Sequence, residues 1–153
     1  MEDKEQKYKD LSNQIEAVLD DKISWIGNFS NVTALIKTVF GHWWCGFYMV
    51  RNHQLELGPF QGPVACTSIQ FGKGVCGSSW AQEQTIIVPD VHLFEGHIAC
   101  SSESNSEIVV PVFKDDKVLA VLDIDSIHFN QFDEIDKLYL EKIAERLTKF
   151  YTN

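Results

Sequence analysis

Three of the four cysteines in this chain lie in segments rich in glycine and hydroxyl residues, where a thiol can be reactive. They are Cys66, Cys76 and Cys100, the last within "IACSSESNS". Backbone N–H groups in such segments can lower the pKa of a thiol and hold its thiolate ready as a nucleophile. The alternative for each is a buried thiol with no chemical role. Cys45 lies in the bulky apolar run "WWCGFYMV", which predicts an inert core residue.

The same cysteines raise the question of a metal site. His97 lies just before Cys100, and with Cys66 and Cys76 it would complete a set of three cysteines and one histidine for zinc. However, no two cysteines lie close together in the sequence, as the usual zinc knuckle requires. The spacing therefore disfavours a metal. A local signature for Cys–His acyl transfer is also missing.

Acidic residues at the end of an apolar segment form a second candidate group. Asp123 and Asp125 end "AVLDIDS", and their spacing puts them on one face of a strand. Aspartates there are costly unless they are paired or bind a cation, although Asp125 could simply mark the exit to solvent. Glu107 begins the preceding strand. A two-residue loop in "KDDK" would place it opposite Ile124, facing away, so a joint site requires an odd-length loop or a single bulge.

The stretch "GKGVCG" formally matches a dinucleotide fingerprint. That fingerprint needs a parallel βαβ unit and an acidic residue about 20 positions further on. Here the next strand ends too early, at "VPD", and the sheet is predicted to be antiparallel. We therefore expect these glycines to form a tight turn that brings the backbone close to a small group.

Hydrophobic spacing predicts helices and strands in one domain, residues 1–153. Helices are expected over residues 4–20, 30–40 (with Ser30 or Asn31 as the N-cap), 75–84 and 133–151 (with Asp133 as the N-cap). Strands are expected over residues 43–50, 54–58, 85–90, 107–113 and 117–124, with a loop between the second and third. Consecutive strands are too close for helical crossovers, so we predict an α+β fold with helices on one face of an antiparallel sheet.

Charge and hydropathy exclude several partners. The net charge of −9 argues against a nucleic-acid partner, which needs a dense basic face. No apolar run is long enough for a membrane span, and the polar start lacks a secretion signal. We therefore expect a cytoplasmic protein with no membrane partner, in a compartment where thiols stay reduced.

Four segments together resemble the free methionine-R-sulfoxide reductases, a family built on the GAF domain. They are "LGPFQGPVACT", "GKGVCG", "VPDVHLFEGHIACSSESNSEIVVPV" and "VLDIDS". The likeness runs from about Trp43 to the last helix and keeps the order and spacing of three cysteines. It implies a GAF-like antiparallel sheet with N- and C-terminal helices packed on it, in agreement with the hydrophobic spacing.

The resemblance also implies an activity. Members of the family are oxidoreductases that reduce free L-methionine-(R)-S-oxide to methionine with thioredoxin as reductant, and no metal or other cofactor is expected. It makes Cys100 the nucleophile, Cys66 the usual resolving thiol and Cys76 an alternative partner. Cys100 would pass through a sulfenic acid to a disulfide.

The resemblance further assigns the substrate-binding residues. Glu107, Asp123 and Asp125 match the carboxylates, and Trp44 and Tyr48 match an aromatic wall. A homodimer through the terminal helices is compatible with the fold family. The competing hypothesis is a GAF-type module that senses a small molecule or redox state, which a single domain without an output domain disfavours.

Overall fold

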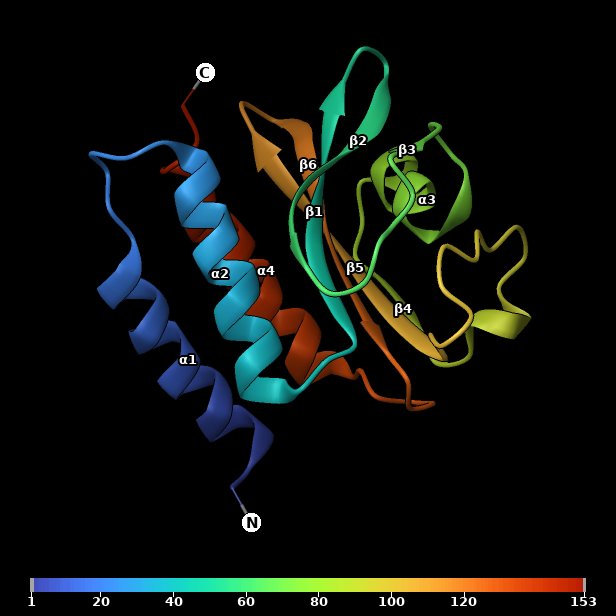
Figure 1. Ribbon diagram of the computed structural model, residues 1–153, viewed down its shortest axis with the longest axis horizontal. Coiled ribbons are helices and arrows are strands. Elements are labelled where there is room, and N and C mark those ends of the chain that lie inside the picture. The colour runs from blue at the N-terminus through green and yellow to red at the C-terminus, as the bar shows by residue number, and fades with distance from the viewer. Residues whose placement is uncertain (1, 153) are drawn as a thin grey trace.

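A six-stranded sheet organises the protein, with strand order β3-β2-β1-β6-β5-β4 and every neighbouring pair antiparallel (Figure 1). This computed structural model describes residues 2–152. The strands are β1 (Trp44–Arg51), β2 (Gln54–Gln61), β3 (Ser68–Ile69), β4 (Ile86–Val88), β5 (Ser106–Lys114) and β6 (Lys117–Ser126). The helices are α1 (Lys4–Val18), α2 (Trp25–Phe40), α3 (Gly74–Gln82) and α4 (Glu134–Thr148), with a 3₁₀ turn at Val91–Leu93. The predicted α+β class is confirmed.

One face of the sheet carries three of the helices. α2 and α4 pack directly on the strands, and α1 packs on these two helices (Figure 1). Buried Tyr8 of α1 donates a hydrogen bond of 2.6 Å to Asp136 of α4, and Lys4 forms an ion pair of 2.7 Å with the same carboxylate. Asp136 also completes the capping box with the predicted N-cap Asp133. This layer leaves the other face of the sheet for the site.

The opposite face is covered by α3 and the segments around it, which corrects the expectation that all helices share one face (Figure 1). Val75 of α3 and Val91 pack there against Val109 and Val121 of the central strands. The physical reason is visible in "IVVPV", because a continuous apolar run is buried on both faces of a sheet. The site is therefore enclosed between the sheet and this second layer.

Two element boundaries differ from the predictions. Helix α2 begins at Trp25 with Ser24 as its N-cap, not at Ser30 or Asn31, because the helix continues through Gly27. Strand β2 continues to Gln61 through the predicted loop. Pro59 is accommodated there because the β1–β2 register shifts beside it, between Gly46 and Tyr48, and proline is tolerated at a bulge.

The β5–β6 hairpin contains the irregularity on which a joint acidic site depends. The two-residue turn at Asp115 and Asp116 pairs Lys114 with Lys117, as the sequence suggests. A register shift then occurs at Val112/Phe113, so Glu107 pairs with Asp125 instead of Ile124. The single bulge thus places Glu107 on the same face as the aspartates. In residues 2–152 no helix has the length and apolar character to cross a membrane.

Candidate active site

A cavity between the sheet and the α3 layer collects the predicted site residues from five different segments of the chain. Its wall includes Trp44, Tyr48, Cys76, Cys100, Glu107, Asp123 and Asp125. Cys66 does not line the cavity itself, but it is bonded to Cys100. All eight predicted residues therefore meet at one place, although they are up to 81 positions apart in sequence (Trp44 to Asp125).

Cys66 and Cys100 form a disulfide, with Cα atoms 5.5 Å apart. It joins the β2–β3 connection to the segment that precedes β5. Both residues are half-buried, so a thiol from outside can approach the bond. The bond also consumes two of the four ligands in the zinc set considered from the sequence, and that set is not available in this form.

The other two cysteines are free and buried. Cys45 lies on the helix-covered face, in the core, as predicted. Cys76 lies on the site face, and burial, reinforced by the charge of Asp123, raises the pKa of its thiol well above the usual value. In this form Cys76 is therefore a protonated thiol in the cavity wall. Its "GKGVCG" segment forms the expected tight turn, with positive φ at Gly72 and Gly74.

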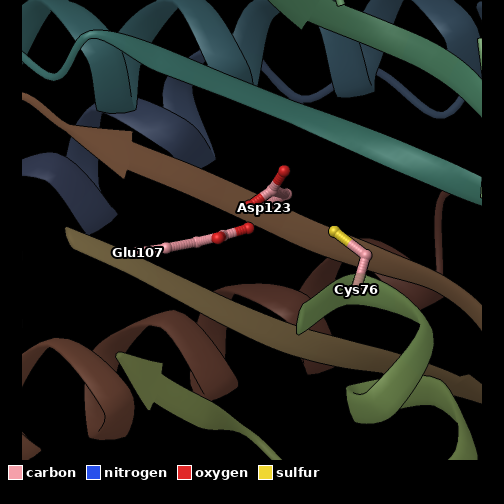
Figure 2. A group of neighbouring side chains, drawn as sticks. All are labelled: Cys76, Glu107 and Asp123. Carbon is pink, nitrogen blue, oxygen red and sulfur yellow. The ribbon is translucent and has the colours of Figure 1, made fainter. Parts of the chain in front are cut away.

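Glu107 and Asp123 form a compact buried cluster with Cys76. Figure 2 shows Glu107 and Asp123 pointing toward one another from adjacent strands, with the thiol of Cys76 beside them. Donor atoms of these three residues all lie within 4.8 Å of one another. Zinc binding here would require the loss of the thiol proton of Cys76 and of the protons that burial favours on the carboxyl groups. The cluster is better suited to an organic cation.

Burial dominates the acid–base behaviour of this cluster. It raises the pKa of Glu107 to about 8, with the charge of Asp125 adding to the effect. Burial also raises the pKa of Asp123 well above its usual value, with the charge of Glu107 as the next cause. The pKa of Asp125 is raised by burial and by Asp123, although the hydrogen bond from Ser104 opposes the shift. At least one of these groups is thus a carboxylic acid near neutral pH.

Hydrogen bonding in the cluster is incomplete. Oδ1 of Asp125 accepts a hydrogen bond of 2.9 Å from Oγ of Ser104. Oδ1 of Asp123 is buried and has no partner among the described residues. An unsatisfied buried acceptor is costly, so this atom favours a ligand that brings an N–H donor.

The aromatic wall is held in place by its polar atoms. Nε1 of Trp44 donates to the carbonyl oxygen of Pro63 at 3.0 Å, and the hydroxyl of Tyr48 donates to the carbonyl oxygen of Cys66 at 2.9 Å. The Trp44 ring stacks between Phe60 and Tyr48, with centroids 5.3 and 5.9 Å away. Tyr48 therefore links the wall to the disulfide.

Gly46 makes this arrangement of Trp44 possible. A Cβ atom at position 46 would lie 2.5 Å from Cη2 of Trp44 and 2.4 Å from Cβ of Phe60. Strand alternation puts Trp44, Gly46 and Tyr48 on the same face. The Trp44 ring thus occupies the space that a side chain at position 46 would need.

The sequence interpretation missed three contributors to the site. Trp43 lines the cavity and donates from Nε1 to Oγ of Ser101 at 3.1 Å, next to Cys100. Ser104 orients Asp125. His97, considered as a zinc ligand or as one of five possible histidine bases but not as a neighbour of the acids, has its Nε2 3.5 Å from Oε2 of Glu107. Proximity to Cys100 in the sequence was the available signal for His97 and Ser104.

Comparisons with known proteins agree with this geometry. The GAF domain matches residues 26–149. GAF domain-containing protein A of Dictyostelium discoideum is 52% identical, over 94% of this chain and 92% of its own length. Free methionine-R-sulfoxide reductase of Saccharomyces cerevisiae is 44% identical, over 95% of this chain and 86% of its own.

A solved structure of a reductase from the same family is similar to this chain. The X-ray structure of free methionine-R-sulfoxide reductase from Neisseria meningitidis, in complex with its substrate, has a TM-score of 0.96 and 49% identity. The alignment covers 99% of this chain and 92% of that one. The resemblance inferred from the sequence motifs is thereby confirmed, and the chain belongs to the GAF-domain family of free methionine-R-sulfoxide reductases.

Proposed function

We propose that this protein reduces free L-methionine-(R)-S-oxide to L-methionine through a cysteine cycle recharged by thioredoxin. One observation carries the proposal: the Cys66–Cys100 disulfide adjoins a cavity whose wall holds three clustered carboxyl groups. The reductase names and substrate complex of close relatives support it. Each group has a defined chemical task.

The first step transfers the sulfoxide oxygen to Cys100. Its thiolate attacks the sulfoxide sulfur while Glu107, protonated because of burial, gives a proton to the oxygen. Methionine leaves, the substrate sulfur is reduced, and Cys100 becomes a sulfenic acid. Asp123 or Asp125 could replace Glu107 as the acid, since burial raises the pKa of both.

The second step closes the disulfide. The thiol of Cys66 attacks the sulfenic acid, forms the bond to Cys100 and releases water. A dithiol such as thioredoxin then reduces the bond by exchange. We assign Cys76 as an alternative partner for Cys100, because its thiol lines the same cavity.

The acidic cluster explains why a free amino acid would be the substrate. Its α-ammonium group can donate to Asp125 and to the unpartnered Oδ1 of Asp123. An N-blocked or peptide-bound methionine sulfoxide lacks that charge and leaves the acids unpaired, which can reduce turnover by several orders of magnitude. Trp44 would pack against the S-methyl group of the substrate.

The proposed setting is the cytoplasm, because thioredoxin-type reductants keep thiols reduced there. A homodimer is also part of the proposal. Ile23 and Ile26, at the α1–α2 junction, are 45% and 53% exposed and offer an apolar contact surface. Sedimentation of Ile26→Asp beside the unmodified protein tests it, and identical masses would contradict a dimer through this surface.

The function is tested by methionine release from three compounds: free methionine-(R)-sulfoxide, its (S) epimer and the N-acetylated (R)-sulfoxide. Thioredoxin, its reductase and NADPH supply electrons, with dithiothreitol in a parallel series. We expect turnover of the free (R) form alone, and none by Cys100→Ser. Absence of methionine from the reduced protein in both series would overturn the proposal.

A further inference from the structure

His97 connects the buried acids to the surface of the protein. Its Nε2 lies 3.5 Å from Oε2 of Glu107, and its side chain is 15% exposed where that of Glu107 is 7% exposed. Among the described residues that line the cavity, His97 is the one basic side chain. It is therefore both a neighbour of Glu107 and partly exposed to solvent.

The proposed reaction leaves Glu107 without its proton. The resulting carboxylate lies in a cluster with Asp123 and Asp125 of β6, and beside Cys76 of α3, none of which can supply a positive charge. A buried charge without a partner is costly. A new proton must therefore reach Glu107 before the next turnover.

We propose that His97 is a proton-relay residue that carries one proton from solvent to Glu107 each time the sulfoxide is reduced. This inference rests on the proposed function and on Glu107 as the acid. His97 acts through Glu107 and needs no contact with the substrate.

The charges of the two groups favour transfer in this direction. While Glu107 is protonated, burial lowers the pKa of His97, so its imidazole is neutral. Once Glu107 has lost its proton, the carboxylate at 3.5 Å favours imidazolium. His97 then takes a proton from solvent and passes it to Glu107, which leaves both groups neutral again.

The proton balance gives a measurable quantity. A thiolate at Cys100, a thiol at Cys66 and the acid at Glu107 convert one sulfoxide into methionine, water and a disulfide, leaving a carboxylate. Restoring Glu107 then takes one proton from solvent for each methionine formed.

The test follows a single turnover of pre-reduced protein, without added reductant, in a stopped-flow instrument. A pH indicator records proton uptake, and quenched samples record methionine. In the unmodified protein the two should appear together. In His97→Gln we expect methionine within about threefold of the normal rate and proton uptake delayed about tenfold or more. Imidazole replacing part of the buffer should remove the delay.

Two controls separate the alternatives. His128→Gln changes an exposed histidine outside the cavity and should behave as the unmodified protein. Thermal unfolding of His97→Gln shows whether the variant folds, and His97→Ala repeats the test with a smaller side chain. Proton uptake that keeps pace with methionine in both variants would overturn the relay, as would a loss of methionine formation that imidazole does not restore. Absence of methionine from the unmodified protein would instead overturn the proposed function.

Discussion

Glu107 lies directly opposite Asp125 across the β5–β6 ladder, and both side chains line the same cavity. This pairing follows from one bulge near the turn, without which Ile124 would lie opposite Glu107. With Asp123 next to them, the two acids form a cluster in which burial and like charge raise each pKa. The cluster is therefore expected to stabilise a bound cation and to destabilise the empty protein when its acids ionise.

The pKa of Glu107 gives a prediction for stability against pH. Because the folded protein raises this pKa from 4.5 to about 8, it binds the proton more tightly than the unfolded chain does. This contribution to the free energy of unfolding is complete below about pH 4.5 and is lost as the pH rises to about 8. Glu107→Gln should thus be more stable than the unmodified protein at about pH 8, by up to a few kcal/mol, and similar at about pH 5. Urea denaturation at both values measures this, and an unchanged pH dependence would contradict it.

Asp125 is expected to select the α-ammonium group of the substrate. Asp125→Asn keeps the size of the side chain but removes the charge, so KM for the free (R)-sulfoxide should rise about 10- to 100-fold. Ser104→Ala removes the hydrogen bond from Ser104 to Asp125 and should have a smaller effect in the same direction. Dithiothreitol-driven kinetics provide both values. A KM in Asp125→Asn equal to that of the unmodified protein would exclude this role.

Gly46→Ala tests the position of Trp44. The added methyl group would lie 2.4 Å from Cβ of Phe60 and 2.5 Å from Cη2 of Trp44, far closer than a van der Waals contact, so the indole must move. We expect a loss of about 1–3 kcal/mol in stability, together with a higher KM for the sulfoxide. Gly41→Ala is the matched control, since Gly41 is a positive-φ helix cap that does not line the cavity, and an added Cβ there meets no atom within 4 Å. If both variants lose stability but neither changes KM, the aromatic wall is not used for binding.

Substitution of Cys66 and substitution of Cys76 should have different effects on thioredoxin-driven turnover. Cys66→Ser is expected to lose most thioredoxin-driven turnover, about tenfold or more, because the Cys100 sulfenic acid has lost its usual partner. Turnover by Cys76→Ser should stay within about threefold of that of the unmodified protein. Burial keeps the Cys76 thiol protonated, and this variant still has Cys66 as the partner for Cys100. Steady-state rates with thioredoxin decide between them. A larger loss in Cys76→Ser would reverse the assignment of the resolving thiol.

Local patterns were sufficient for much of the fold and for the list of site residues. The capping box at Asp133, the paired strands of the hairpin and the burial of Cys45 all follow from short-range rules. The pairing of Glu107 with Asp125 could be predicted only on the condition that the hairpin contains a bulge. A bulge is a compromise between strand pairing and packing, and no local sequence pattern encodes it.

The missed features depend on contacts between distant segments. Helix α2 starts before Gly27 because tertiary packing, with Phe29 fully buried, outweighs the low helix propensity of glycine. The placement of α3 on the second face depends on the two-sided burial of β5, whose apolar side chains face both layers. The proximity of His97 to Glu107 depends on how the segment before β5 folds back on the sheet, so it can be recognised only in the folded structure.

The central claim is that Cys100 takes the oxygen of the free (R)-sulfoxide and passes its oxidation to Cys66. The direct measurement is a single turnover of fully reduced protein, followed by quantification of methionine and mass spectrometry of the cysteines. We predict one methionine per chain and a Cys66–Cys100 disulfide, a sulfenic acid on Cys100 trapped by dimedone in Cys66→Ser, and no methionine from Cys100→Ser. Methionine formed by Cys100→Ser, or an oxidised pair that excludes Cys100, would contradict the account.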